Sequence, residues 1–268
     1  SGGVPAYKDI TKEEYVLVGS KSPRHPTTEA FRGLRTNLQY LLNKEGQNTI
    51  LVSSMHPGEG KTFTATNMAA LLAQAGKKTL LIDYDLHKPR VHRALNVDRG
   101  TGLSGYLIGQ VSWAMAVQPT DISGLDVITS GPIPPNASEL VLNDRTDELI
   151  AEARKVYDFV VIDTPPILLI TDALVLMKHV DRALLVANVK RANARGMRQL
   201  EDLLEQNSID HVSMVLNGIV PTRWRYYASK YAYRYLYSYG YGYGGYGSYT
   251  GYGGYGYGDQ RYGDEDEA

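Results

Sequence analysis

The stretch from residue 50 to residue 72, ILVSSMHPGEGKTFTATNMAALL, sets a glycine-rich loop between an apolar run and a helical segment. Glycines at 58 and 60 let backbone N–H groups turn toward phosphate oxygens, and the amides of a helix N-terminus add further donors. In this order Lys61 reaches the β- and γ-phosphates of a nucleotide, and the Thr62 hydroxyl suits Mg²⁺. The stretch therefore predicts a site for ATP and Mg²⁺ at Gly58, Glu59, Gly60, Lys61, Thr62 and Phe63.

The loop departs from the general pattern G-x-x-x-x-G-K-[ST] at its first position, where this chain has Met55. A chance glycine-rich turn before a helix is the alternative interpretation. An apolar strand ending at Ser53 and a helix after Thr62 flank the loop in the order that phosphate binding requires, so phosphate binding is favoured.

Acidic side chains follow two of the apolar runs. LLIDYDL ends with Asp83 and Asp85, and FVVIDTPP carries Asp163. Strand ends in an α/β sheet face the ligand crevice, where such carboxylates hold Mg²⁺ through water or accept a proton. The alternative, that these residues only begin turns, is weak beside a phosphate loop for Asp83 and Asp163 and stays open for Asp85. The predicted catalytic set is Lys61, Asp83, Asp85 and Asp163, and the predicted metal set is Thr62, Asp83 and Asp163.

Six short apolar runs must position these residues. Each run is rich in valine, isoleucine and leucine on both faces, which is typical of buried parallel strands, and amphipathic segments lie between the runs. This alternation predicts an α/β fold of the P-loop NTPase type, with a mostly parallel, doubly wound sheet and helices on both faces. The runs are TILVSS (49–54), KTLLIDYD (78–85), GLDVITS (124–130), DFVVIDTPP (158–166), RALLVANV (182–189) and HVSMVLNGIV (211–220).

Helical spacing of apolar residues predicts helices at 28–43, 64–78 and 145–156, the first capped by Thr27 or Thr28. Three regions follow from the change of pattern along the chain. Residues 1–25 are expected to be an arm or linker, and residues 26–222 the P-loop kinase domain. Residues 223–268 are expected to be a flexible, disordered tail, because this Tyr/Gly-rich segment has almost no aliphatic residues to bury.

Composition excludes several function classes. The 268 residues include no cysteine, which excludes thiol catalysis, iron–sulfur clusters and disulfides and favours the cytoplasm. A formal charge of −1 gives no global attraction to nucleic acid or to an anionic membrane. No apolar run approaches the roughly 18 residues that cross a bilayer, so the chain is expected to be soluble. The opening Ser-Gly-Gly is typical of a cloning remnant, and we expect a longer parent protein.

The motifs SSMHPGEGKT, LLIDYDLHKPR and YDFVVIDTPP resemble the Walker A, Walker A′ and Walker B motifs of bacterial tyrosine kinases. These kinases are the cytoplasmic domains of Wzc-like polysaccharide co-polymerases. The resemblance runs from about Val18 to the C-terminus and includes EAFRGLR, SGPIPPNASELV and the tyrosine cluster. The family tolerates a residue other than glycine at Met55. It often has arginine where His87 stands, and Lys88 and Arg90 could supply that charge instead.

The resemblance implies a role for each matched residue. Lys61 holds the β- and γ-phosphates, Thr62 is a ligand of Mg²⁺, and Asp163 holds the metal through water. Asp83 binds a metal water or takes the proton of the incoming tyrosine, and Asp85 assists. Asn217 ends a late strand at the point where relatives recognise adenine; a plain turn residue is the alternative.

Glu29, Arg32 and Arg35 lie three residues apart on one side of a predicted helix. On their own they indicate a solvated face, but the family uses this spacing to pack subunits into a ring, so a homo-oligomer such as an octamer is expected. The family also implies a membrane-embedded co-polymerase segment and a tyrosine phosphatase as partners, at the cytoplasmic face of the inner membrane. The basic residues Lys190, Arg191, Arg195 and Arg198 indicate a solvated helix face, with a subunit or membrane contact as the alternative.

Fifteen of the 21 tyrosines lie between Tyr226 and Tyr262. A β-stripe, an adhesive low-complexity segment and a flexible phospho-acceptor all fit this concentration. Reach favours the acceptor, because a Gly-rich tail of this length spans roughly 35 Å, enough to enter a neighbouring subunit. The predicted acceptors are Tyr231, Tyr233, Tyr235, Tyr237, Tyr239, Tyr241 and Tyr243.

Together these features predict an ATP-dependent tyrosine autokinase that phosphorylates its own tail in trans within a ring and regulates capsule or exopolysaccharide synthesis and export. One alternative is a partition-type P-loop ATPase, but those proteins carry a signature lysine near the position of His56, and this chain has none there. A non-enzymatic scaffold whose tail condenses is the other alternative, and the intact set of Lys61, Thr62, Asp83 and Asp163 disfavours it.

Overall fold

The computed structural model describes residues 2–5, 17, 26–42 and 46–219. The predicted tyrosine tail, its acceptor tyrosines and most of the predicted N-terminal arm lie outside the described residues.

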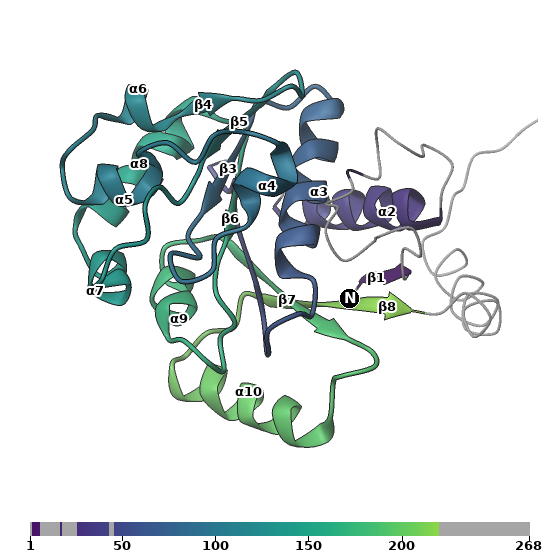
Figure 1. The fold of residues 1–268 in the computed structure, drawn as a ribbon. Helices are drawn as coiled ribbons and strands as arrows, with labels where there is room; N and C mark the ends of the chain where they lie inside the picture. Colours follow the sequence, from purple (N-terminus) through teal and green to yellow (C-terminus); the bar gives the residue numbers. More distant parts are fainter. Residues whose placement is uncertain (1, 6–16, 18–25, 43–45, 220–268) are drawn as a thin grey trace, which may run out of the picture. The chain divides into compact units, whose positions relative to one another are not determined.

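Within the described residues, eight strands form one sheet in the order β1-β8-β7-β2-β6-β3-β5-β4 (Figure 1). Every neighbouring pair is parallel except β4 and β5, which are antiparallel. The mostly parallel sheet predicted from the apolar runs is confirmed. The strands are β1 (Gly2–Pro5), β2 (Thr49–Ser54), β3 (Thr79–Asp83), β4 (Gln118–Pro119), β5 (Leu125–Ile128), β6 (Phe159–Asp163), β7 (Arg182–Asn188) and β8 (Val212–Ile219).

Helices cover both faces of this sheet, as predicted. One apolar cluster joins the strands to α2, α3 and α4, and a second joins them to α5, α7, α8, α9 and α10. The helices are α2 (Pro26–Leu41), α3 (Lys61–Gln74), α4 (Val91–Leu95), α5 (Gly102–Leu107), α6 (Trp113–Ala116), α7 (Ala137–Val141), α8 (Arg145–Val156), α9 (Asp172–Met177) and α10 (Ala194–Gln206).

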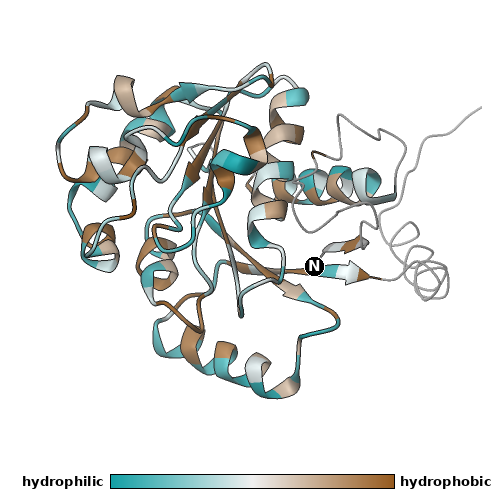
Figure 2. Ribbon diagram, viewed as in Figure 1, coloured by the Kyte–Doolittle hydropathy of each residue, from teal (hydrophilic) through white to brown (hydrophobic). Residues whose placement is uncertain are grey.

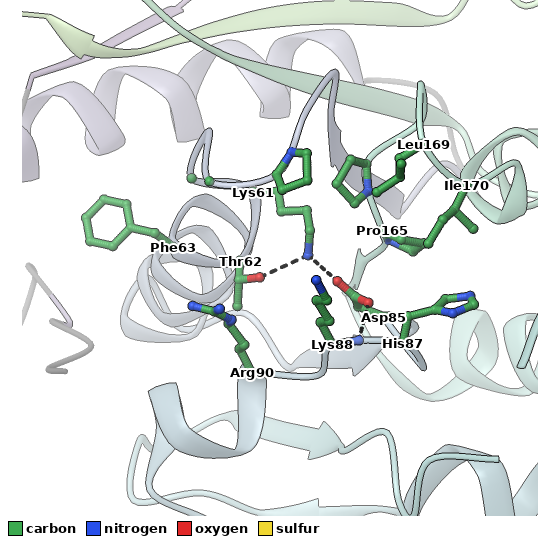
Figure 3. Close-up of a pocket in the computed structure, with 14 residues that line it drawn as sticks. Lys61, Thr62, Phe63, Asp85, His87, Lys88, Arg90, Pro165, Leu169 and Ile170 are labelled. Atoms are coloured by element: carbon green, nitrogen blue, oxygen red, sulfur yellow. Dashed lines mark hydrogen bonds and ion pairs between the residues drawn. The ribbon is translucent and has the colours of Figure 1, made fainter. Parts of the chain in front are cut away.

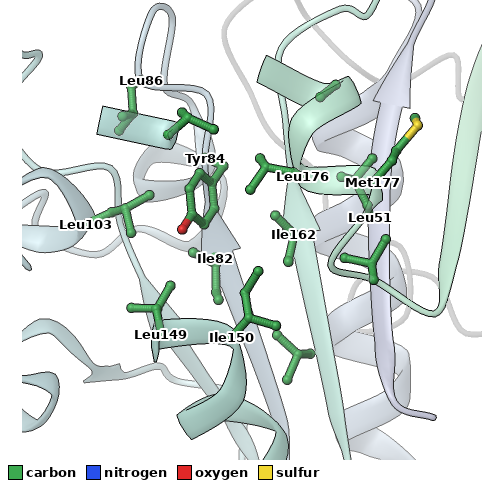
Figure 4. Packing of buried hydrophobic residues seen from close by; sticks show 14 of the residues in the cluster. Leu51, Ile82, Tyr84, Leu86, Leu103, Leu149, Ile150, Ile162, Leu176 and Met177 are labelled. Carbon is green, nitrogen blue, oxygen red and sulfur yellow. The ribbon is translucent and has the colours of Figure 1, made fainter. Parts of the chain in front are cut away.

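The central strands are apolar on both faces because both faces are covered. In β2, Leu51 belongs to one cluster while Ile50 and Val52 belong to the other. Figure 2 shows the hydrophobic colouring running along these strands, and Figure 4 shows Tyr84 and Ile162 packed in the cluster of Leu51. This double burial is the reason that the sequence signal was a continuous apolar run and not an alternation.

All six predicted strands are present, and α8 has the predicted bounds of 145–156. The predicted cap of the first helix is wrong. Helix α2 begins at Pro26, so Thr27 and Thr28 lie inside its first turn, and both are fully buried. Proline suits a first helical position, because it has no N–H to leave unpaired there and its φ is already helical.

Two edge strands were not predicted from the sequence. Residues 2–5, at the start of the expected arm, form β1 and pair in parallel with β8. At the opposite edge, β4 is only two residues long and runs antiparallel to β5. Such short strands carry no periodic pattern, so pairing with a preformed edge decides their structure. None of the helices in the described part of the chain could span a membrane, being too short or too polar.

Candidate nucleotide site at the carboxyl edge of the sheet

The loop between β2 and α3 turns at the two glycines that the motif contains. Gly58 and Gly60 have φ values of 79° and 101°, a region that glycine alone enters without strain. Glu59 between them is fully buried, and its Oε2 accepts a hydrogen bond of 2.8 Å from the His56 amide. Helix α3 begins directly after the loop, at Lys61, so the free amides of its first turn lie next to the loop.

Lys61 links the loop to the ends of β3 and β6. Its Nζ lies 2.7 Å from Asp85 Oδ2 and 3.2 Å from Thr62 Oγ1 (Figure 3). It also lies 3.7 Å from Asp163 Oδ1. The Thr62 hydroxyl in turn donates a hydrogen bond of 2.7 Å to Asp163 Oδ2. Residues predicted from three separate motifs therefore meet at one point.

Strand register brings the carboxylates together. Asp83 and Asp163 are register partners at the ends of adjacent parallel strands, and both are fully buried. The Asp83 carboxylate accepts hydrogen bonds from the amides of Asp85 and Val91, at 3.3 and 3.2 Å. The Lys88 amide donates to Asp85 Oδ1 at 2.9 Å, which orients the carboxylate that faces Lys61.

Burial and mutual charge tune these groups in opposite directions. Burial together with the charge of Asp163 raises the pKa of Asp83 well above its usual range. Burial also raises the pKa of Asp163 to about 6, although Lys61 and the Thr62 hydrogen bond oppose the shift. For Asp85 burial is outweighed by Lys61, so its pKa is lowered. Burial opposes the charge of Lys61, but Asp163 and Asp85 prevail and raise its pKa.

The donor set fits Mg²⁺ held jointly with phosphate oxygens. Asp163 Oδ1 is buried and makes no hydrogen bond within the described residues, and the Thr62 hydroxyl lies beside the other oxygen of that carboxylate. Over the described ranges, no group of three or more histidines and carboxylates is arranged to hold a metal by itself. Mg²⁺ commonly takes one or two protein ligands and completes its shell with water and phosphate, so these residues suit a metal that arrives with a nucleotide.

A cavity of about 270 Å³ opens over this network. Basic residues form part of its wall, and an apolar wall of prolines and aliphatic side chains faces Lys61 (Figure 3). Asp83, Asp163 and Glu59 do not line the cavity and are fully buried. The lining residues are Pro57, Gly58, Gly60, Lys61, Thr62, Phe63, Asp85, His87, Lys88, Arg90, Pro165, Pro166, Leu169 and Ile170.

Several lining residues were not predicted as part of the site. Pro165 and Pro166 directly follow the Asp163 strand, and that adjacency was the one available signal for the apolar wall. His87, noted only as a departure from the family, lies 3.1 Å from Asp172 at the start of α9, a pairing across 85 residues that the sequence does not show.

Two further predicted groups lie on other elements. Asn217 in β8 donates a hydrogen bond of 2.8 Å from its side chain to the Glu59 carbonyl, so it lies against the loop. On α2, Glu29 and Arg32 form an ion pair with each other, and Arg35 Nη1 lies 3.5 Å from the Leu71 carbonyl of α3.

Comparison with known proteins places this site in a family. Residues 47–214 match the family model described as an AAA domain. The tyrosine-protein kinase YwqD of Bacillus subtilis is 36% identical over 217 residues, which is 80% of this chain and 92% of YwqD. The chain belongs to the bacterial tyrosine-kinase family. The resemblance found in the motifs is thereby confirmed.

Other members differ in length. The tyrosine-protein kinase wzc of Salmonella typhimurium is 36% identical over 81% of this chain, and the match spans only 30% of wzc. The kinase domain of Escherichia coli ETK superposes with a TM-score of 0.76 at 32% identity, covering 82% of this chain and 89% of that domain. This chain thus corresponds to the kinase portion of the longer relatives.

The partition-type alternative shares the fold alone. The septum site-determining protein MinD of Pyrococcus horikoshii, solved with Mg-ADP, superposes with a TM-score of 0.52 at 23% identity over 63% of this chain. A P-loop fold of this kind implies nucleotide binding. Family membership therefore favours the tyrosine-kinase interpretation over the partition-type ATPase.

Proposed function

We propose that this chain transfers the γ-phosphoryl group of ATP to tyrosine hydroxyls, including those of its own tail. The observation that carries the proposal is that Lys61, Thr62 and Asp85 line a cavity with a cationic and an apolar wall, and that Lys61 and Thr62 also contact the buried Asp163. In the transfer the phenol oxygen bonds to the γ-phosphorus, the bond to the bridging β–γ oxygen breaks, and ADP leaves.

The loop amides and Lys61 bind the phosphates. Lys61, now paired with Asp85 at 2.7 Å, exchanges that partner for phosphate oxygens when a nucleotide binds. Thr62 and, through water, Asp163 and Asp83 would hold Mg²⁺, which supplies positive charge to the phosphate oxygens when bound. Burial and the charge of Asp163 raise the pKa of Asp83, so its ionised carboxylate would be a stronger base for the phenol proton. Positioning matters more than base strength, because the transition state is loose.

The apolar wall supports tyrosine as the acceptor. Pro165, Pro166, Leu169 and Ile170 line the cavity, and Leu169 is 64% exposed. Of these, Figure 3 labels Pro165, Leu169 and Ile170, on the side that faces Lys61. A phenol ring can cover this surface while its hydroxyl points to the phosphates, whereas serine and threonine have no ring to bury.

We propose that the acceptor tyrosines Tyr231–Tyr243 reach this cavity in a neighbouring subunit. Glu29, Arg32 and Arg35 on α2 would form part of the contact within a ring. Each phosphorylated tyrosine adds about −1.5 to −2 charges, so several on one tail would make subunits repel and the ring disassemble. The setting would be the cytoplasmic face of the inner membrane in a capsule or exopolysaccharide system, beside a membrane-embedded segment and a tyrosine phosphatase.

Mass spectrometry after incubation with ATP and Mg²⁺ tests the proposal. We expect phosphotyrosine in the tail of the wild type and of Lys77→Met, an exposed control lysine, and none in Lys61→Met. Wild-type protein with no phosphotyrosine would refute the kinase function. Sizing of the same samples tests the ring, since an equal oligomer size in all of them despite heavy phosphorylation would refute disassembly.

A further inference from the structure

The turn between β7 and α10 is held in one conformation by its own hydrogen bonds. The carbonyl of Asn188 accepts from the amides of Arg191 and Ala192, at 2.9 and 2.8 Å, and its side-chain oxygen accepts from Lys190 N at 3.0 Å. Asn193 then caps α10 by accepting from Gly196 N at 2.9 Å. These hydrogen bonds therefore fix the backbone position from which the Arg191 side chain extends.

Arg191 lies against the phosphate loop, 134 residues earlier in the chain. Its Nη1 donates a hydrogen bond of 2.9 Å to the Pro57 carbonyl. A Cβ built on Gly58 would lie only 2.6 Å from the same Nη1, so the guanidinium rests directly on the Gly58 backbone. Asn217 makes the matching contact two residues further along, to the Glu59 carbonyl at 2.8 Å.

These two contacts supply hydrogen-bond donors to loop carbonyls, which any loop that binds anions through its backbone amides needs. When the amides of the loop turn inward toward phosphate, neighbouring carbonyls turn outward and need donors. Glycine peptides flip readily between conformations, and Gly58 and Gly60 alternate with the two residues whose carbonyls are bound. A flipped peptide would aim a carbonyl oxygen at a phosphate and repel it.

We propose that Arg191 is a positioning residue that holds the Pro57–Gly58 peptide in the orientation that binds phosphate, as Asn217 does for the Glu59–Gly60 peptide. The inference rests on the proposed nucleotide-binding function. It gives Arg191, which is exposed like Lys190 and Arg195, a contact with the phosphate loop in addition to its place among the basic residues.

Calorimetric titration with ADP and steady-state kinetics with ATP test this role. We expect Arg191→Ala to raise the Kd for ADP and the KM for ATP by roughly tenfold, the effect of losing one charge-assisted hydrogen bond, with kcat within twofold of wild type. Arg191→Lys keeps a cationic donor and should recover most of the affinity. Arg195→Ala, which removes an exposed arginine from the first turn of α10, four residues further along, is the matched control and should bind ADP like the wild type.

Three results would overturn the inference: unchanged ADP affinity in Arg191→Ala, an equal loss in Arg195→Ala, or a loss in kcat with KM unchanged. If Arg191→Ala fails to fold, Arg191→Lys and Arg191→Gln replace it in the test. Both variants keep a hydrogen-bond donor, and only lysine keeps the positive charge. ADP binding weakened by tenfold or more in both variants would overturn the role. Wild-type protein that does not bind ADP would instead refute the proposed function itself.

Discussion

Replacing Lys61 by methionine should destabilise the nucleotide-free protein as well as abolish catalysis. The Lys61 side chain is only 12% exposed and its partner Asp85 only 5%. Removing one partner of a buried ion pair costs about 3–5 kcal/mol, because the other charge is left in a poorly solvated place. Methionine keeps the length and apolar stem of lysine, so the change isolates the charge.

The lower end of that range, about 3 kcal/mol, is expected at pH 8, because the pKa values of Asp83 and Asp163 are already raised, so these carboxyls take up a proton more readily once the charge of Lys61 is lost. For a domain of this size that corresponds to a fall in Tm of about 10 °C. Without Lys61, the depressed pKa of Asp85 should rise above its unfolded value. The native variant then binds more protons than the unfolded chain, so its stability rises as pH falls from 8 toward 5.

Urea unfolding of wild type, Lys61→Met and the double variant Lys61→Met/Asp85→Asn, at pH 8 and pH 5.5 without nucleotide, measures these terms. The double variant should regain most of the lost free energy at pH 8, and the deficit of the single variant should shrink at pH 5.5. Lys77→Met is the control for a general lysine effect. Equal stability of wild type and Lys61→Met at pH 8, or no recovery with Asp85→Asn, would refute the reasoning.

Three further predictions concern the loop, the apolar wall and the sheet. Gly60→Ala should abolish ADP binding measured by calorimetry, because residue 60 has a φ of 101° and the added Cβ would lie 2.2 Å from the side-chain nitrogen of Asn217. Gly76→Ala is the control and should bind ADP normally, since Gly76 also has a positive φ, of 79°, but has open space around it. Leu169→Ser should raise the KM for a tyrosine peptide several-fold and leave the Kd for ADP unchanged. Leu142→Ser, at a residue that is 66% exposed directly after α7, should change neither. Burial opposes the charge of Asp181, but a hydroxyl, two amides and an arginine lower its pKa, so Asp181→Asn should cost about 2 kcal/mol at pH 7 in urea unfolding. That difference should narrow as pH falls below about 4, through the folded pKa, and a constant difference from pH 7 to pH 3 would contradict the assignment.

Local signals predicted much of this fold. Both faces of the central strands are buried, so each strand had to be apolar along its whole length, and the six runs were visible without any tertiary information. Helix α8 was equally visible, because only one of its faces packs against the sheet. The cap at Thr27 or Thr28 failed because both side chains are buried in the domain, a demand that outweighs the local preference of threonine for a cap.

The phosphate loop was determined by the sequence itself. Phosphate binding requires positive φ at Gly58 and Gly60 and a lysine directly after them. These requirements fall within a few consecutive residues, so they appear in the sequence as a motif. The tertiary structure decided the rest. Register between β3 and β6 sets Asp83 opposite Asp163, and the β7–α10 turn carries Arg191 onto a loop 134 residues away. Contacts between distant segments depend on how the strands are ordered in the sheet, and strand order leaves no mark in the spacing of residues along the chain.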